Sequence, residues 1–261
     1  MNGDPPGRRA ELAANLAAVR ARIAVACAAA SRDPGELTLI AVTKTYPAAD
    51  VLALVDLGVR DIGENRDQEA APKAALVAAA LAPPAAPSGS VAQTGSIAAT
   101  GSANDPVTWH FIGQLQTNKA HSVARYAHVV HSVDRVRLVR VLGGAATAAG
   151  RELTCLVQVS LDDDPARGGV PGAGAGDVAA AIEAEPGLRL GGVMAVAPLG
   201  ADPAAAFASL RELSATVRSI NASATIISAG MSGDLGPAVA NGATHLRIGT
   251  ALLGNRTPPF L

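Results

Sequence analysis

The sequence has 261 residues and a formal net charge of −1, with 49% hydrophobic and only 16% charged residues. A chain of this length can form one large barrel-type domain or two smaller domains, so length alone does not decide the domain count. The near-neutral charge and the lack of a Lys/Arg cluster argue against nucleic acid as a partner, and the lack of an uninterrupted run of roughly 18 apolar residues argues against a membrane.

An amphipathic helix is predicted near the N-terminus, over residues 8–30. Its apolar residues recur at spacings of three and four, which places them on one face of a helix. They are Leu12, Leu16, Val19 and Ile23. Polar, Pro and Gly residues at 31–35 then end the helix.

Short apolar or β-branched runs alternate with helical segments along the rest of the chain. The predicted strands are 37–43, 60–62, 108–112, 128–132, 153–160, 189–195, 224–228 and 244–248. Strands separated by helical runs favour right-handed βαβ units, and a count of eight favours a closed barrel over an open sheet. We therefore predict an α/β fold, a single (β/α)8 TIM barrel over residues 1–261 with an extra N-terminal helix.

Residues 82–106 interrupt this alternation. They are rich in Pro, Ala, Gly, Ser and Thr and have almost no large apolar side chains to bury. Such a segment cannot offset the entropy lost on ordering, so we predict a flexible surface insertion.

Two cysteines, Cys27 and Cys155, lie far apart and form no CxxC pair. This pattern argues against a disulfide framework or a thiolate zinc site and fits a reducing compartment. Both cysteines are predicted to be small core residues. The N-terminus lacks an ordered basic, apolar and cleavage-site series, so the predicted location is the cytoplasm.

The first predicted strand ends in "AVTKTYP", where an apolar run meets the ammonium group of Lys44. Period-two alternation places Ile40, Val42 and Lys44 on one face of this strand, and barrels of this type carry functional groups at the C-terminal strand ends. If that face points inward, partial desolvation favours a neutral, nucleophilic amine of the kind that forms Schiff bases. A lysine that reaches from a strand end into solvent is the alternative.

Glycine and hydroxyl residues follow the seventh and eighth predicted strands. Ser228 and Ser232 belong to "SAGMSGDL", and Ser232 is predicted to cap a helix that starts near Gly233. Gly249 and Thr250 follow the eighth strand. Amides at helix N-termini bind phosphate, and barrels commonly place this site after strands 7 and 8. Each loop alone could be an ordinary capped turn.

A lysine amine opposite a phosphate site matches the needs of pyridoxal 5′-phosphate (PLP), which requires an anchor for its aldehyde and one for its phosphate. Arg247 lies one strand step before the second of these loops. If Arg247 meets the pyridine nitrogen, its guanidinium can only donate, so that nitrogen stays unprotonated and the ring is a weaker electron sink. Arg247 as a structural ion-pair partner at the barrel mouth is the alternative.

Seven motifs occur in a fixed order along the chain: "AVTKTYP", "GENR", "WHFIGQLQTNKA", "HSVD", "GGVMAVAP", "SAGMSGDL" and "LRIGTALLG". In this order they resemble the pyridoxal 5′-phosphate homeostasis protein family, also called the YggS or proline synthase co-transcribed homologue family. The resemblance covers roughly residues 10–256. It implies a fold-type III PLP protein, a barrel similar to the N-terminal domain of alanine racemase.

The resemblance also implies roles for individual residues. Lys44 corresponds to the Schiff-base lysine, Asn65 of "GEN" lies near the cofactor, and Arg247 faces the pyridine nitrogen. The other implied cofactor-binding residues are Ser228, Ser232, Gly249 and Thr250 at the phosphate, with His110, Met194, Gly230 and Met231 around the cofactor. Without the resemblance, His110 is interpreted as a core histidine whose hydrogen bonds are satisfied. Glu64 is predicted to orient loop groups by hydrogen bonding.

The sequence departs from the family's pattern in three places. The insertion at 82–106 is longer than expected before "WHFIG". After the fifth strand, "VSLDDDPARGGV" replaces the usual Asn, Glu and Lys pattern, and Arg167 stands where a lysine is common. Ala229 stands where the family often has Met, a change that leaves the implied phosphate-binding residues in place.

No metal site and no catalytic residue is predicted. His128 and His131 lie three residues apart on a predicted strand, so their side chains fall on opposite faces. The consecutive side chains of 162–164 diverge, which favours a solvated loop over a metal site. No recurring His/Asp/Glu cluster supports a metal-dependent hydrolase.

Two functions compete. In the first, which the resemblance implies, the protein holds, buffers or transfers PLP without robust catalysis, and apo-enzymes that use PLP are candidate acceptors. In the second it is an amino-acid racemase, which needs an acid/base pair on both faces of the α-carbon.

The carrier function is favoured. The related racemases obtain a second base, a Tyr, from an additional C-terminal β domain, and this chain ends eight residues after Leu253. Of its two tyrosines, Tyr46 shares the strand parity of Lys44, but Pro47 is predicted to turn the chain there. We also expect a monomer, although the sequence leaves the oligomeric state open because no interface stripe is separable from the barrel's own helices.

Overall fold

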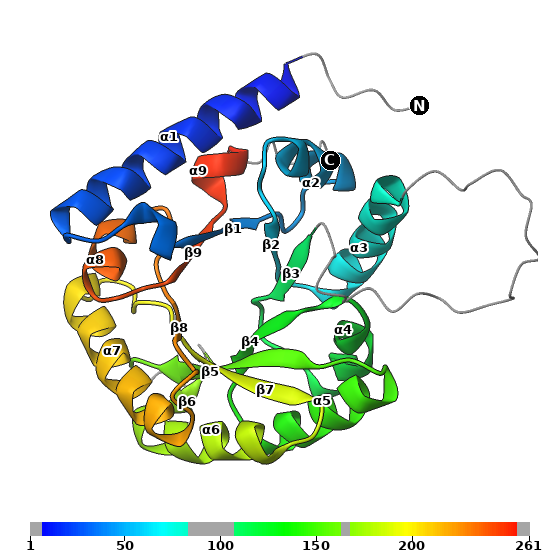
Figure 1. Ribbon diagram of the computed structural model, residues 1–261, viewed down its shortest axis with the longest axis vertical. Helices are drawn as coiled ribbons and strands as arrows, with labels where there is room; N and C mark the ends of the chain where they lie inside the picture. Colours follow the sequence, from blue (N-terminus) through cyan, green and yellow to red (C-terminus); the bar gives the residue numbers. More distant parts are fainter. Residues whose placement is uncertain (1–6, 83–106, 163–167, 255–261) are drawn as a thin grey trace, which may run out of the picture.

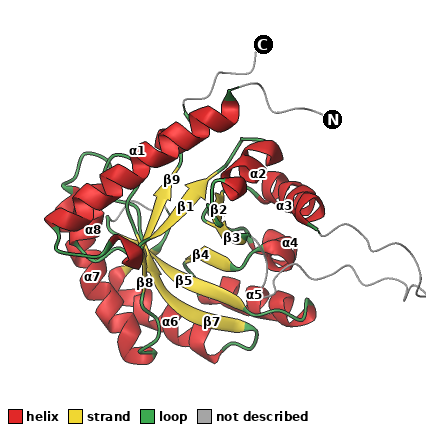
Figure 2. Ribbon diagram, turned by 45° about the horizontal axis from the view of Figure 1, so that its top comes forward, coloured by secondary structure: helices red, strands yellow, loops and turns green. Residues whose placement is uncertain are grey.

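A closed barrel of parallel strands forms the centre of the molecule (Figures 1 and 2). The structure is a computed structural model and describes residues 7–82, 107–162 and 168–254. The barrel strands are β1 (Thr38–Val42), β2 (Asp61–Glu64), β3 (Thr108–Phe111), β4 (Val129–Val133), β5 (Leu153–Ser160), β7 (Leu188–Met194), β8 (Ile226–Ser228) and β9 (His245–Ile248). Each overlaps a predicted strand, so the predicted (β/α)8 barrel is confirmed.

Pairing between the first and last strands closes the barrel. Ile40 of β1 is in register with Asp61 of β2 on one side and with Arg247 of β9 on the other. β4 also pairs with β5. Each barrel strand is thereby paired on both sides, and the sheet has no free edge within the ring. The short strand β6 (Val170–Pro171) pairs only with the end of β5 and lies outside the closed ring.

Helices surround the barrel, as expected for right-handed βαβ connections (Figure 1). They are α1 (Arg8–Ala29), α2 (Ala48–Asp56), α3 (Asp67–Leu81), α4 (Ala120–Tyr126), α5 (Val136–Ala148), α6 (Ala175–Ala184), α7 (Pro203–Ile220), α8 (Leu235–Ala240) and α9 (Thr250–Leu253). The helix predicted near Gly233 begins at Leu235, with Asp234 at its N-cap position, so the prediction that Ser232 caps it is wrong.

Helix α1 is the extra N-terminal helix and lies beside α8 and α9 (Figure 1). By length and composition alone, this helix of 22 residues is long and apolar enough to cross a membrane. In the structure its predicted apolar stripe is buried against the rest of the protein, while only 28% of its apolar window is buried. The predicted stripe consists of Leu12, Leu16, Val19 and Ile23, and the buried Cys27 continues it.

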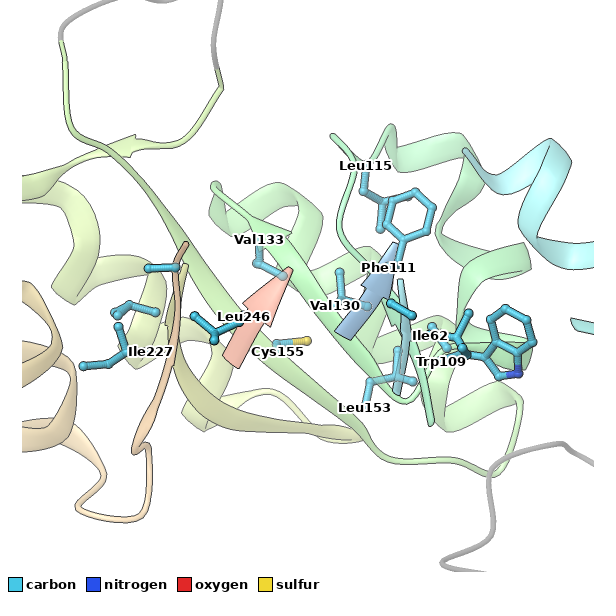
Figure 3. Close-up of a cluster of buried hydrophobic side chains, with 14 of the residues drawn as sticks. Ile62, Trp109, Phe111, Leu115, Val130, Val133, Leu153, Cys155, Ile227 and Leu246 are labelled. Atoms are coloured by element: carbon cyan, nitrogen blue, oxygen red, sulfur yellow. The ribbon is translucent and has the colours of Figure 1, made fainter. Parts of the chain in front are cut away.

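The main apolar core fills the layer between the strands and the helices. Figure 3 shows part of it, with Trp109, Phe111, Val130 and Leu246 among the buried side chains of this cluster. Cys155 belongs to this layer and Cys27 to the α1 interface, and both thiols are free and buried, as predicted. Burial raises the pKa of the Cys155 thiol to about 12, which makes it unreactive.

A second, smaller apolar cluster contains Val129, Leu156 and Met194, with Ile226 packed against it. Nearby, Gly192 has a φ of 144°, and a Cβ there would lie 2.0 Å from the carbonyl oxygen of Ile226. Only glycine permits this close approach of β7 and β8, where the β5–β7 register also shifts.

Several predictions concern residues outside the described part of the chain. These are the flexible insertion, apart from Ala82, and the positions of Asp163, Asp164 and Arg167.

Candidate functional site

A cavity of about 620 Å³ lies at the C-terminal ends of the strands. Lys44 and Asn65 reach it from the ends of β1 and β2, and Met231 and Ser232 from the loop after β8. The last strand and the helix after it supply the rest of the predicted wall, namely Arg247, Gly249 and Thr250. Seven of the eleven predicted site residues thus line one cavity.

Lys44 lies in a turn that directly follows β1. Val42 and Lys44 both line the cavity, as the predicted alternation requires. The next residue, Thr45, has a φ of 67°, a left-handed conformation that is costly for a β-branched side chain. Its amide donates to Glu69 Oε2 of α3 at 3.0 Å, so the helix holds the turn in this conformation.

Glu64 and Lys73 form a buried support beneath this turn. Lys73 Nζ donates to Glu64 Oε1 at 2.6 Å and to the carbonyl of Thr43 at 2.8 Å. The Thr43 hydroxyl donates to the same carboxylate oxygen at 2.6 Å. Burial raises the pKa of Glu64, while the hydrogen bonds from Lys73 and Thr43 oppose this shift. The predicted orienting role of Glu64 is consistent with these contacts.

Arg247 is held from two sides at the cavity wall. Its Nη1 donates to Ser228 Oγ at 2.6 Å and its Nη2 to the carbonyl of Ala195 at 2.8 Å. Burial lowers the pKa of the guanidinium to about 10, so it stays charged at neutral pH. No described carboxylate pairs with it within ion-pair distance, which does not support the alternative of a structural ion-pair partner.

Four predicted site residues lie behind the wall of the cavity. His110 is buried, with Nδ1 2.9 Å from His131 Nε2 and Nε2 3.0 Å from Asp61 Oδ1. Met194 belongs to the smaller apolar cluster. Ser228 is buried, and its hydroxyl contacts Arg247 and His131. Gly230 accepts the backbone N–H of Arg247 at 2.9 Å.

Helix α1 contacts both segments that carry the glycine and hydroxyl residues, the loop after β8 and the short helix α9. Arg22 donates to the carbonyl of Ser232 at 2.5 Å, and Asn15 donates to the carbonyl of Leu252 at 3.0 Å. Gly249 is the N-cap residue of α9, so the first amides of this short helix have no intrahelical acceptor. Free amides beside the hydroxyls of Ser232 and Thr250 suit an anionic oxygen ligand.

The sequence interpretation missed several wall residues. Tyr46, Ile112, Val196 and Gly254 were not expected at the cavity, and Val42 and Gly233 were noted only as neighbours of predicted site residues. Tyr46 was weighed only as a second base and was set aside because Pro47 was predicted to turn the chain. It lines the cavity and donates from its hydroxyl to the carbonyl of Gly254 at 2.8 Å. Its strand parity with Lys44 was the signal that could have identified it.

The charge of the cavity is positive. Among its described lining residues, Lys44 and Arg247 are cationic and none is a carboxylate. Within the described ranges, no group of three His, Cys, Asp or Glu side chains is arranged to hold a metal ion. The arrangement can therefore bind an anionic molecule and present it to a primary amine.

Comparison with known proteins identifies the family. The family model described as "Alanine racemase, N-terminal domain" matches residues 14–257. The chain is 44% identical to the pyridoxal phosphate homeostasis protein of Mycobacterium tuberculosis, over 96% of this chain and 95% of that protein. The chain belongs to the pyridoxal phosphate homeostasis protein family. The family predicted from the seven motifs is therefore confirmed.

The chain also resembles solved structures of PipY and of alanine racemase. PipY from Synechococcus elongatus, whose structure has PLP bound, is 31% identical, with a TM-score of 0.74 and coverage of 93% of this chain and 100% of PipY. Alanine racemase from Corynebacterium glutamicum is 12% identical, with a TM-score of 0.62 and coverage of 94% and 60%. The likeness to the racemase therefore concerns the fold alone.

Proposed function

We propose that this chain binds PLP covalently through Lys44 and acts in vitamin B6 homeostasis as a carrier without robust catalysis. The observation that carries the proposal is the single cavity that brings together the Lys44 amine, the Arg247 guanidinium and the loops with Ser232 and Thr250. Its volume, about 620 Å³, lies within the range of small-molecule sites. The family membership and the PLP bound to PipY support the same ligand.

The residues of the cavity fit the separate parts of PLP. The amine of Lys44 suits the aldehyde, and the loops of Ser232, Gly249 and Thr250 suit the phosphate dianion. Asn65 and Met231 lie on the same wall. For the residues behind the wall, cofactor contact stays a prediction. These are His110, Met194, Ser228 and Gly230.

Bound PLP supplies an aldehyde that combines with amines and a pyridine ring that withdraws electrons. Arg247 would weaken the second property, because a charged guanidinium that donates to the pyridine nitrogen would leave that nitrogen unprotonated. The buried Glu64–Lys73 pair holds the Lys44 turn, and α1 holds the phosphate loops. These roles support retention of the cofactor rather than turnover of a substrate.

Borohydride trapping tests the proposal. The sequence has only three lysines, Lys44, Lys73 and Lys119, so peptide mapping after reduction is unambiguous. We expect an absorption band that survives dialysis and a reduced pyridoxyl group on the Lys44 peptide, lost in Lys44→Ala and kept in Lys119→Arg. A colourless protein that cannot be reconstituted, or a label spread over all three lysines, would contradict the proposal.

An amino-acid racemase is the second candidate, and Tyr46 on the cavity wall is the observation that favours it. Its hydroxyl donates to Gly254, however, and a second base also needs to reach the opposite face of a substrate. Exchange of the α-hydrogen of added amino acids with solvent deuterium separates the two functions. Steady multiple-turnover exchange that Tyr46→Phe abolishes would establish the racemase.

The remaining proposals concern the context in which the protein acts. We propose that residues 1–261 form one domain, that the protein is a cytoplasmic monomer, and that apo-enzymes accept its PLP. Two free buried cysteines suit a reducing compartment. Sedimentation equilibrium of the full chain tests the monomer, and reactivation of a PLP-dependent apo-enzyme, with free PLP trapped by a scavenger, tests the transfer.

A further inference from the structure

A line of buried polar side chains crosses the barrel interior and ends at the cavity. It runs from Asp61 through His110, His131 and Ser228 to Arg247. Its four hydrogen bonds measure 3.0, 2.9, 2.9 and 2.6 Å in that order. The five residues come from β2, β3, β4, β8 and β9, so the line joins strands on opposite sides of the barrel. We call it the interior chain.

The two ends of the interior chain fix its hydrogen positions. A guanidinium only donates and a carboxylate only accepts. His110 therefore donates from Nε2 to Asp61, which leaves its Nδ1 as an acceptor for the Nε2 hydrogen of His131. Nδ1 of His131 then accepts from the hydroxyl of Ser228, whose oxygen accepts from Arg247. Each link has one hydrogen, and both imidazoles are neutral.

We propose that Asp61, His110, His131 and Ser228 are positioning residues that hold the Arg247 guanidinium through this one-directional chain. The proposal rests on the proposed function for the identity of the group that Arg247 contacts, the ring nitrogen of PLP. It changes the role of Ser228, which the family resemblance assigns to the phosphate. The hydroxyl of Ser228 is engaged on both sides and acts on the ligand through Arg247.

The opposite direction of the chain is disfavoured by charge. If His131 donated from Nδ1 to Ser228, its bare Nε2 would need a hydrogen from His110 Nδ1. His110 would then have to be doubly protonated to keep its bond to Asp61. That cation would face His245, whose ring centroid lies 6.2 Å away, in the same barrel interior as the charged Arg247. Burial and these neighbours lower the pKa of His131, which agrees with a neutral chain.

Nitrogen NMR of the imidazoles tests the interior chain in the protein without any bound ligand. The protein has only five histidines. In protein labelled with ¹⁵N-histidine, the variants His110→Asn and His131→Asn therefore suffice to assign the imidazole signals of these two residues. At pH 7.5 we expect His110 and His131 each to carry one hydrogen, on Nε2. A hydrogen on Nδ1 of either residue would overturn the proposal.

Asp61 gives a matched pair of variants for the same measurement. It does not line the cavity of Lys44 but borders a separate cavity with Arg60, and its side chain is 28% exposed. Asp61→Asn keeps an acceptor oxygen, so the Nε2–H form of His110 is expected to persist. Asp61→Ala removes the acceptor, and His110 is expected to show a mixture of tautomers. An unchanged pattern in Asp61→Ala would count against a chain that Asp61 directs.

Binding of PLP and of pyridoxal, which has the ring nitrogen but no phosphate, tests the role of Ser228. Loss of a hydrogen bond to a charged group predicts that Ser228→Ala weakens both ligands by the same factor, about tenfold. Ser232→Ala, in the phosphate loop, is expected to weaken PLP and leave pyridoxal unaffected. A Ser228→Ala protein that loses affinity for PLP alone would make Ser228 a phosphate ligand and overturn its positioning role.

The NMR and binding experiments separate the proposed function from the proposal of the interior chain. A wild-type protein that binds neither PLP nor pyridoxal contradicts the proposed function, while the tautomers in the unliganded protein still decide the interior chain.

Discussion

Lys73 Nζ lies 2.6 Å from Glu64 Oε1, and the two side chains are only 7% and 0% exposed. Glu64 Oε2 has no hydrogen-bond partner among the described atoms. Removal of one charge from a buried pair leaves the other without compensation, which is the costly case for an ion pair. The pair also holds the carbonyl and hydroxyl of Thr43, one residue before Lys44. It therefore supports the residue that precedes Lys44.

Lys73→Met is expected to lower the free energy of unfolding by about 3–5 kcal/mol, because it leaves the Glu64 carboxylate buried without a counter-charge. Lys73→Met/Glu64→Gln removes both charges and keeps an acceptor for Thr43, so it is expected to regain at least half of that loss. Urea unfolding of the two variants and the wild type measures the difference. Equal losses in the single and double variants would mean that the unpaired carboxylate is not the cause.

Glu69→Ala is expected to weaken PLP binding several-fold, because the amide of Thr45 loses its acceptor and the Lys44 turn loses a restraint. The loss of stability should stay near 1 kcal/mol, since this bond is exposed. Glu69→Gln keeps an acceptor oxygen and should bind PLP as the wild type does. Arg66→Ala removes an exposed ion pair with Glu69, leaves the hydrogen bond from Thr45 to Glu69 in place, and is the control. PLP titration followed by absorbance measures the affinity of each variant. Weaker binding in Glu69→Ala but not in Glu69→Gln assigns the effect to the hydrogen bond of the turn, and equal weakening in both assigns it to the charge of Glu69.

Acid is expected to destabilise the fold through its buried histidines. Burial lowers the pKa of His131, and it lowers that of His245 from 6.5 to about 4. The folded state holds these imidazoles neutral, so protonation favours the unfolded chain. The contribution of His245 is fully present above pH 6.5 and is lost as the pH falls toward 4, and that of His131 is likewise lost as the pH falls below 6.5. The free energy of unfolding should fall by up to about 1.4 kcal/mol per pH unit for each of them.

His245→Asn isolates one of these groups, and His121→Gln, on the exposed face of α4, is its matched control. Urea unfolding between pH 7 and 5 should give a shallower pH dependence in His245→Asn and a wild-type slope in His121→Gln. Identical slopes in all three proteins would show that His245 titrates alike in the folded and unfolded states.

Gly113→Ala is expected to disturb the cavity from behind. A Cβ at Gly113 would lie 2.1 Å from the carbonyl oxygen of Asn65, and this backbone must move to admit it. We expect a loss of about 1–3 kcal/mol in stability together with weaker PLP binding. Gly144→Ala is the matched control, because nothing lies within 4 Å of its Cβ in the exposed middle of α5. It should stabilise the protein by about 0.5–1 kcal/mol. Similar unfolding midpoints for the two variants would contradict the close contact.

Local patterns were sufficient to predict the barrel. Alternating apolar residues, breakers and helical stripes are properties of neighbouring residues, so all eight barrel strands and the stripe of α1 were predicted from the sequence. The parity of Ile40, Val42 and Lys44 is also local, and it placed the amine on the correct face. The start of α8 was misplaced because Asp234, and not Ser232, occupies the N-cap position.

The sequence by itself determined the fold, the family and the residue types at the cavity, because each is encoded in short motifs at the strand ends. Only the tertiary structure decided which polar groups meet across the barrel. His131 appeared in the sequence only as an unsuitable metal ligand, and Ser228 as a phosphate ligand. Barrel closure brings Ser228 to Arg247 and His131 to Ser228, since side chains of β4, β8 and β9 converge in the barrel interior, where each buried polar group needs a partner. Contacts between strands so distant in sequence carry no local signal.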